Sequence, residues 1–361
     1  MTTRTARTYS PDMATVENRS GGAGVHNPDS DESQPASRIP ERILVLVPNK
    51  PFLGAQLVQL PFLSELRSRY PQSRITLALP FSGGSIFEEF RFQNELVGGY
   101  METTRRTLQF LVRCAAHRHD CVYSLRARSA RTGLAALVTG ARRRIGFGVP
   151  GNRFFFNEIV GPREDAYLAL KYMDLLEGGR QRVTLPRVDL WTTEIALSVT
   201  ALFVERGIHS PCVGIVAGAG GRKKRWPIPR FLALEKEIRD RFPEVTVLYF
   251  LSRGEAEGEI GESLAQVDPR HKFCLEDLRS LACALSRCTV LVSSDCGPAH
   301  FGHLLGMPQV TLFDGDGRPG EWFLARDGAV RVVAEGGQPI SSIEVEEVVE
   351  VVCRTVGFGL R

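Results

Sequence analysis

The sequence has no apolar run near the length of about 20 residues that a membrane-spanning helix needs. Its eight cysteines include no Cys-x-x-Cys pair and no metal-like spacing, so neither a disulfide framework nor a metal site is expected. Reduced thiols of this kind are typical of a cytoplasmic protein. No Gly-x-Gly-x-x-Gly follows the first apolar run, which argues against a dinucleotide-dependent oxidoreductase.

The composition is that of a globular protein, with 43% apolar and 24% charged residues over 361 positions. This length suits two domains of roughly 150 residues each, and a cleft between two lobes is the expected arrangement. The net charge is only +4, yet basic residues gather in clusters that suit anionic partners. No aromatic residues are interleaved with them, so nucleic acid is not expected as a partner. The clusters are Arg126, Arg128 and Arg131, then Arg142 to Arg144, and Arg222 to Arg225.

The cluster at Arg142 to Arg144 is most simply interpreted as a solvated surface. Residues 1–40 are rich in Ser, Pro, Gly, Asn and Asp and contain no apolar core of a signal peptide. We expect them to form a disordered tail and not a secretory signal.

From residue 41 onward, short β-branched runs alternate with segments of helical periodicity. This order predicts repeated βαβ units and hence an α/β protein with doubly wound parallel sheets. One long helix is expected after the first strand, closed by Pro71. The periodicity lapses near residue 185, which divides the chain into lobes at 41–185 and 186–340. The segment 341–361 is predicted to form an amphipathic C-terminal helix.

Ligands of open parallel sheets bind beyond the carboxyl ends of the strands. At one such end the sequence reads SSDCGPAH, and a helix is expected to begin at Gly297 to Ala299 with Asp295 as its N-cap. Free N–H groups there would bind a phosphate by donating hydrogen bonds to it, and His300 would add a further hydrogen bond. A plain structural cap is the competing interpretation of Asp295.

Two further strand ends carry candidate binding residues. Gly218 lies among small residues that let a ligand approach the backbone, and Lys224 follows as a point charge for a phosphate. Glu255 or Glu257 follows the next strand and is placed to accept hydrogen bonds from a ribose. Ordinary solvated charge is the alternative at both places.

Three segments together resemble glycosyltransferase family 9, the lipopolysaccharide heptosyltransferases. They are ILVLVPN with LGAQLVQLPFLSELRSRYP, AGAGGRKKRWPIPRF, and SSDCGPAHFGHLLGMPQVTLFDG. The resemblance extends from about Arg42 to the C-terminus, and the Asp-Cys-Gly-x-x-His block is its most specific part. Cys296 stands where the family usually has Thr.

This resemblance implies a GT-B fold, in which two Rossmann-like domains face a central cleft. It implies a cytoplasmic inverting enzyme without metal or other cofactor, whose donor is a nucleotide-sugar, expected to be ADP-heptose. The acceptor would be the lipopolysaccharide core or another glycan, and peripheral contact with the inner membrane is a further hypothesis. The C-terminal helix would pack back on the first lobe.

The resemblance also assigns roles to individual residues. Lys224, Asp295 and His300 would act in catalysis, and Gly54, Ala55 and Gln56 would lie on the acceptor side. The donor would be bound by Gly218, Lys224, Glu255, Glu257, Asp295, Cys296, Gly297, Ala299 and His300.

One departure concerns the general base. The family carries Gly-Asp after the first strand, whereas this chain has Gly54 followed by Ala55 and Gln56. A sugar hydroxyl needs a proton acceptor to become a good nucleophile, and neither side chain can serve. Asp295, His300, Glu88 or Glu89 would then supply the base, or a more acidic acceptor would react slowly without one. The other alternative is a non-catalytic nucleotide-sugar-binding protein with the same fold.

Overall fold

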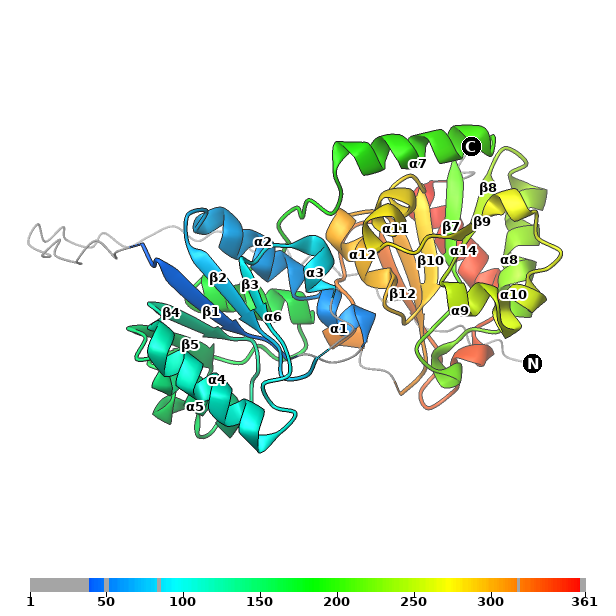
Figure 1. The fold of residues 1–361 in the computed structure, drawn as a ribbon. Coiled ribbons are helices and arrows are strands. Elements are labelled where there is room, and N and C mark those ends of the chain that lie inside the picture. Colours follow the sequence, from blue (N-terminus) through cyan, green and yellow to red (C-terminus); the bar gives the residue numbers. More distant parts are fainter. Residues whose placement is uncertain (1–38, 49–51, 83–85, 317–318, 358–361) are drawn as a thin grey trace, which may run out of the picture.

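The computed structural model describes residues 39–48, 52–82, 86–316 and 319–357. The predicted tail, residues 1–40, lies outside the described residues except for its last two positions. The described chain forms two α/β lobes side by side, joined by an extended linker (Figure 1). No described helix is both long enough and apolar enough to span a bilayer.

The first lobe is a six-stranded sheet in the order β3-β2-β1-β4-β5-β6, with every neighbouring pair parallel. Its central strands are almost wholly buried because helices cover both faces of a parallel sheet. The strands are β1 (Arg42–Leu46), β2 (Arg74–Ala78), β3 (Glu95–Val97), β4 (Cys121–Ser124), β5 (Arg143–Phe147) and β6 (Glu158–Val160). The helices are α1 (Leu53–Leu57), α2 (Leu60–Arg69), α3 (Phe87–Phe90), α4 (Thr104–His117), α5 (Ala130–Val138) and α6 (Leu168–Leu176), with the 3-10 turn η1 (Asn152–Phe154).

The second lobe repeats this design in the order β12-β11-β10-β7-β8-β9, again with parallel pairs. Its strands are β7 (Cys212–Val216), β8 (Thr246–Leu251), β9 (Lys272–Cys274), β10 (Val290–Ser294), β11 (Gln309–Phe313) and β12 (Ala329–Val333). Its helices are α7 (Thr193–Glu205), α8 (Ile228–Arg241), α9 (Arg253–Ala256), α10 (Glu259–Ser263), α11 (Leu278–Leu285), α12 (Ala299–Leu305), α13 (Pro319–Trp322) and α14 (Val345–Val356). The 3-10 turns are η2 (Arg222–Lys224), η3 (Pro269–His271) and η4 (Ile340–Ser342).

The predicted α/β class with two doubly wound parallel sheets is confirmed. The single helix expected after the first strand is instead broken into α1 and α2. Pro61 lies in the first turn of α2, where its missing N–H does no harm. Inside one continuous helix its ring would clash with the carbonyl of Leu57, so the chain starts a new helix there.

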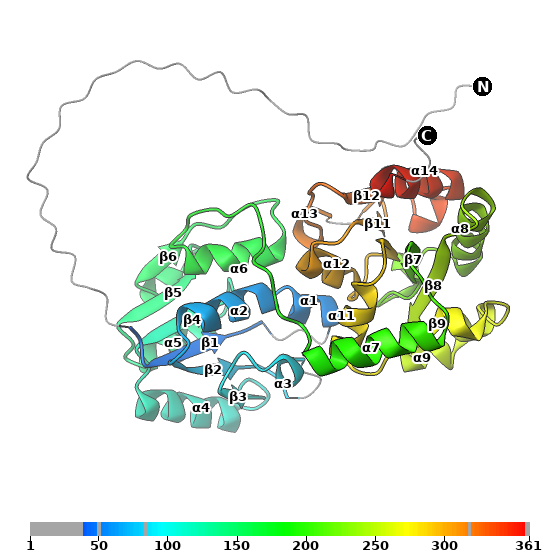
Figure 2. The same ribbon diagram turned by 90° about the horizontal axis from the view of Figure 1, so that it is seen from above.

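The prediction that the C-terminal helix packs back on the first lobe is wrong. Helix α14 packs against α8 and against strands β10, β11 and β12 of its own lobe. Figure 2 shows it at the far side of the second lobe, away from the first sheet. Its apolar stripe, which includes Val348, Val349 and Val352, is fully buried in the core of that lobe. A helix whose whole apolar face is used locally has none left for a second domain.

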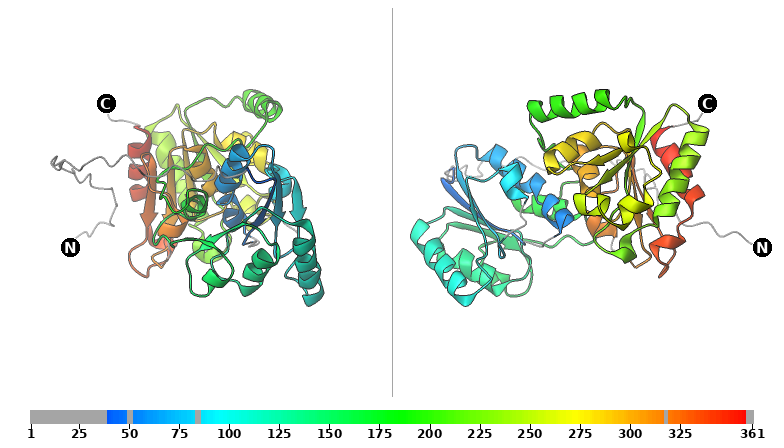
Figure 3. Two further views of the ribbon diagram at one scale, coloured as in Figure 1. Left: turned by 90° about the vertical axis from the view of Figure 1, so that its left-hand side faces the viewer. Right: turned by 45° about the vertical axis from the view of Figure 1, so that its right-hand side comes forward.

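The two lobes share one apolar core through the linker. Residues 177–192 contain no helix or strand, and Val188 and Leu190 in this segment are buried in a cluster that reaches from β1 to α12. A polar contact reinforces this junction, because the backbone N–H of Arg279 in α11 donates to Glu89 Oε1 in α3 at 3.0 Å. The lobes also meet through α1 and α12 and through α3 and α11, and Figure 3 shows the two sheets on either side of this contact.

Candidate active site between the two lobes

The turn after β10 differs from its prediction. Asp295 was expected to cap the next helix, but α12 begins at Ala299 with Pro298 as its N-cap and without a side-chain cap. The backbone N–H of Ala299 lies close to the thiol of Cys296. Burial raises the pKa of Cys296 to about 12, and the carboxylates of Asp295 and Glu255 add to this rise. The thiol is therefore neutral at physiological pH.

Asp295 pairs instead with Lys224, whose Nζ lies 2.5 Å from Oδ2. The basic turn that carries Lys224 is anchored by Trp226, which is fully buried. The backbone N–H of Trp226 donates to Ser294 Oγ at 3.0 Å, and its indole N–H donates to the carbonyl of Ile343 at 3.0 Å. The basic turn is thereby held against the end of β10 and the segment before α14. Lys224 keeps 53% of its side chain exposed, so its charge remains available to a ligand.

His300 is buried between the lobes. Its Nδ1 lies 2.9 Å from the hydroxyl of Tyr167 in the first lobe, and the two rings are nearly parallel. The ring of Trp322 meets the imidazole edge-on at a centroid distance of 5.8 Å. Burial lowers the pKa of His300 to about 4, with Lys224 adding to the effect against an opposing contribution from Asp295. His300 is therefore a neutral hydrogen-bonding group at physiological pH.

Glycines allow the two lobes to meet at this point. A Cβ on Gly54 in α1 would lie 2.6 Å from Cδ2 and 2.8 Å from Nε2 of His300. A Cβ on Gly297 would lie 2.8 Å from that of Leu53. Helix α1 therefore approaches the start of α12 closely only because both positions lack side chains.

An interlobe cavity of about 470 Å3 opens at this contact. It brings together seven of the predicted site residues. Three of them, Gly54, Ala55 and Gly297, have at most a methyl group as side chain. Ala299 lies behind it and is buried. The lining residues are Phe52, Gly54, Ala55, Gly220, Gly221, Lys224, Asp295, Cys296, Gly297, His300 and Trp322.

Gly218 and Glu255 are also brought together, beside this cavity. A Cβ on Gly218 would lie 1.6 Å from Glu255 Oε1, so only glycine leaves room for the carboxylate. Glu255 Oε2 accepts the N–H of Ser252 at 2.8 Å in a capping box that begins α9. Glu257 ends the same helix, is exposed and does not line the cavity. Gln56 is buried and turned away, and its Oε1 accepts the N–H of Ile86 at 3.0 Å.

A second cavity of about 500 Å3 adjoins the first on the side of the first lobe. Ala55 and Trp322 line both cavities. We call this second one the basic cavity, because its lining includes four cationic side chains and one carboxylate, that of Glu321. The cationic side chains are Arg126, Arg128, Arg163 and Lys171.

Sequence reasoning did not identify Tyr167, Lys171, Glu321 or Trp322. They lie in α6, in α13 or directly before α6, outside every recognised motif, and only the packing of the lobes brings them together at the site. Of the suggested substitutes for the base, Glu89 accepts the N–H of Arg279, and burial raises its pKa against that hydrogen bond. Neither Glu88 nor Glu89 lines either cavity.

The Arg142 to Arg144 cluster largely serves the fold. Arg143 donates to both oxygens of Glu158, at 2.7 and 2.8 Å, across the edge of the sheet. Arg144 donates to the carbonyls of Phe155 and Ala141. Their charges are thus committed to neighbouring loops. Arg126 and Arg128 of the first basic cluster, in contrast, line the basic cavity.

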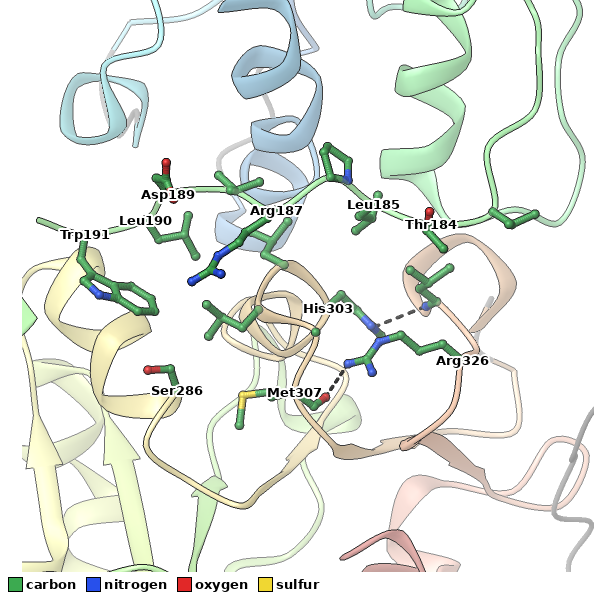
Figure 4. Close-up of a pocket in the computed structure, with 17 residues that line it drawn as sticks. Thr184, Leu185, Arg187, Asp189, Leu190, Trp191, Ser286, His303, Met307 and Arg326 are labelled. Carbon is green, nitrogen blue, oxygen red and sulfur yellow. Dashed lines mark hydrogen bonds between the residues drawn. The ribbon is translucent and has the colours of Figure 1, made fainter. Parts of the chain in front are cut away.

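A third cavity of about 640 Å3 lies between the linker and α12 (Figure 4). His303 faces it from the turn of α12 that follows His300, and Arg326 donates to the carbonyl of Met307 at its edge. Burial holds the pKa of His303 well below its usual value, so this ring is also neutral. The cavity shares no lining residue with the other two. Within the described ranges, no group of three or more His, Cys, Asp and Glu side chains is arranged to hold a metal ion.

Comparisons with known proteins place this architecture in a class. The structure of a glycosyltransferase family 9 protein from Veillonella parvula DSM 2008 superposes with a TM-score of 0.65 at 20% identity, covering 88% of this chain and 97% of that one. E. coli ADP-heptose lps heptosyltransferase II gives 0.62 at 20% identity, over 87% and 98% of the two chains. E. coli heptosyltransferase WaaC with ADP gives 0.61 at 14% identity, over 88% and 98%. The chain therefore has the GT-B fold of these glycosyltransferases.

Residues 180–342 match the family model described as glycosyltransferase family 9 (heptosyltransferase). The resemblance to that family expected from the sequence is thus confirmed over this range. No curated protein matches the chain significantly in sequence. The match contains every candidate residue of the second lobe, including Lys224, Asp295 and His300.

Proposed function

We propose that this protein is an inverting glycosyltransferase of the heptosyltransferase type. It moves a sugar from a nucleotide-sugar, with ADP-heptose as the expected donor, to the lipopolysaccharide core or another glycan. The observation that carries this proposal is the interlobe cavity, where Lys224, Asp295 and His300 meet Gly54 and Ala55 of the opposite lobe. Similarity to heptosyltransferases in fold and over residues 180–342 supports the donor class.

The donor's diphosphate fits the part of the cavity formed by the second lobe. The backbone at Gly220, Gly221 and Gly297 is open to close approach, because these residues have no side chains. Lys224 supplies the positive charge for the phosphates, and Asp295 holds its ammonium in place. Glu255, fitted against Gly218, is the proposed partner of the ribose hydroxyls.

The reaction then follows from these positions. The acceptor oxygen attacks the anomeric carbon from the side of the first lobe, while the bond from that carbon to the diphosphate breaks. Negative charge develops on the leaving phosphate, where Lys224 stabilises it. His300 is neutral and fixed by Tyr167, so it serves as a hydrogen-bond partner of the phosphate or the reacting sugar and not as a positive charge.

The basic cavity is the proposed acceptor site. Arg126, Arg128 and Arg163 would favour an acceptor that carries carboxylate or phosphate groups. We expect the protein to act in the cytoplasm, with peripheral contact at the inner membrane where lipid-linked acceptors lie. The alternative remains a non-catalytic nucleotide-sugar-binding protein, and the methyl group of Ala55 at the junction of the two cavities is the observation that motivates it.

Calorimetric titration of ADP and of ADP-heptose tests the donor site. Removing one charge-assisted hydrogen bond costs about 1.5–3 kcal/mol, so Lys224→Ala should weaken binding about 10- to 100-fold. Asp295→Ala should also weaken it, because Lys224 loses its partner. The matched control is Lys223→Ala, an exposed lysine of the same turn that does not line the cavity. Failure of the wild-type protein to bind any nucleotide, or equal binding by all variants, would contradict the proposal.

A further inference from the structure

The missing carboxylate can be located in three dimensions. The resemblance places the family's Asp at position 55, and Ala55 lines both the interlobe cavity and the basic cavity. This is the place where an acceptor hydroxyl in the basic cavity would face a sugar in the interlobe cavity. A proton acceptor is needed near this junction, and a methyl group cannot provide one.

Only two carboxylates line either cavity within the described ranges, those of Asp295 and Glu321. Asp295 lies on the donor side and its Oδ2 is occupied by Lys224. Glu321 lies on the acceptor side. It lines the same cavity as Ala55, and it directly precedes Trp322, which lines both cavities and contacts His300.

We propose that Glu321 is the general base that replaces the missing carboxylate at position 55. The inference rests on the proposed transferase function and adds to it the residue that receives the proton. In this chain the base would come from α13 of the second lobe, across the junction from α1 of the first. Figure 2 shows α13 beside α12 on the side of the second lobe that faces α6.

The neighbours of Glu321 hold one of its two carboxylate oxygens and leave the other accessible. Lys171 Nζ of α6 lies 3.3 Å from Glu321 Oε1, and the lysine side chain is only 15% exposed. At the start of α13, Gly320 lies close to the backbone of Asp165, where an added Cβ would be 3.4 Å from the carbonyl oxygen. Among the described residues, Glu321 Oε2 makes no hydrogen bond, and 38% of the side chain is exposed to the cavity and solvent. One oxygen is thus held while the other is open to an acceptor hydroxyl.

Lys171 is a positioning residue in this arrangement. Its ion pair holds the Glu321 side chain toward the first lobe, where the acceptor would bind. The pair also links α6 to α13, so both lobes contribute to the position of the base.

The proposed step is balanced. The acceptor O–H bond breaks and its proton passes to the Glu321 carboxylate, while the freed oxygen pair forms the new bond to the anomeric carbon. The bond from that carbon to the phosphate oxygen breaks, and its electron pair leaves with the nucleoside diphosphate. Glu321, now a carboxylic acid, returns the proton to solvent through its exposed edge.

Steady-state kinetics of Glu321→Gln test the assignment, with ADP-heptose as donor and deacylated lipopolysaccharide inner core as acceptor. ADP release is followed with acceptor and also without it, since water then serves as the nucleophile. General-base catalysis contributes about 10² to 10⁴ in rate, so kcat should fall by that factor. The ADP-heptose Kd should stay within twofold, because the carboxylate does not touch the donor phosphates.

Two further variants separate catalysis from folding. Glu164→Gln changes the same charge at an exposed position near α6 that lines neither cavity, and should leave kcat unchanged. Ala55→Asp in the Glu321→Gln background restores a carboxylate at the junction and should recover at least tenfold in kcat. A merely structural role of Glu321 would not be rescued from the opposite lobe.

The results of these experiments separate the role of Glu321 from the proposed transferase function. If the wild-type protein transfers sugar and Glu321→Gln retains kcat within threefold, the base assignment is overturned and the transferase function stands. If the wild-type protein binds ADP-heptose but releases no ADP with or without acceptor, it is a binding protein and Glu321 is not a base. If it does not bind the donor, the proposed function itself fails.

Discussion

Gly54→Ala tests the contact between α1 and α12. In an ordinary helix this change stabilises by about 0.5–1 kcal/mol, because glycine loses more backbone freedom on folding. At Gly54 the new Cβ would lie 2.6 Å from His300 Cδ2 and 2.8 Å from Nε2. Both distances are shorter than real Cβ contacts, so either the imidazole or the helix must move.

The imidazole has little room to move. His300 is 3% exposed, bonded to Tyr167 at 2.9 Å and in contact with Trp322. Overpacking at such a site costs about 1–3 kcal/mol. Subtracting the gain in helix propensity leaves a net loss of up to about 2.5 kcal/mol in the free energy of unfolding. The same shift widens the interlobe cavity and should weaken ADP binding.

Urea unfolding measures the first effect and calorimetry the second. Gly254→Ala is the matched control, since Gly254 lies in helix α9 with nothing within 4 Å of an added Cβ and should show only the gain. In a His300→Ala background the clash is gone, so Gly54→Ala should become neutral or stabilising. The account of the interlobe contact is refuted if Gly54→Ala is as stabilising as Gly254→Ala and leaves ADP binding unchanged.

Three other predictions concern the same site. Burial lowers the pKa of His300 to about 4 in the folded protein, against an ordinary value of 6.5 for an exposed histidine. The unfolded chain therefore binds the extra proton, and stability falls as pH falls from about 6.5 to 4, by about 3 kcal/mol in full. His300→Gln should lack this loss of stability at low pH. If the free energy of unfolding varies with pH in the same way in the two proteins, buried His300 is not the group responsible. Gly218→Ala should displace Glu255 and weaken ADP binding. The lost capping box should cost less than about 2 kcal/mol of stability. Unchanged ADP binding in a calorimetric titration would argue against a ribose role for Glu255. Lys224→Ala should change the free energy of unfolding by less than about 1 kcal/mol, because the lysine is half exposed. A larger loss in urea unfolding would indicate that Lys224 has a structural and not a binding role.

Much of the fold could be predicted because buried parallel strands leave a clear pattern. The runs at β1, β7 and β10 are mostly apolar and almost wholly buried, and each is followed by a helical segment. Strands β3, β6, β9 and β12 were not predicted. All four lie at a sheet edge, and all but β12 are only three residues long. Such short runs carry no periodicity.

The site was predictable only where one turn carries several of its residues. The residues from Asp295 to His300 share the turn after β10, so a local motif reveals them. The cap role of Asp295 was mispredicted because Lys224, 71 positions away, competes for its carboxylate. Tyr167 and Glu321 act through contacts 133 and 150 positions away, respectively, and no local pattern encodes such pairs. The surface against which α14 packs likewise depends on where its valines fit, and the periodicity of the helix does not specify that surface.

The most direct test of the central claim is a crystal structure of this protein with ADP-heptose bound. We predict that the diphosphate lies in the interlobe cavity within hydrogen-bond distance of Lys224 Nζ, with the sugar toward Ala55 and the ribose toward Glu255. Electron density for the nucleotide in the cavity beneath the linker, or in the interlobe cavity with its phosphates away from Lys224, would contradict the account.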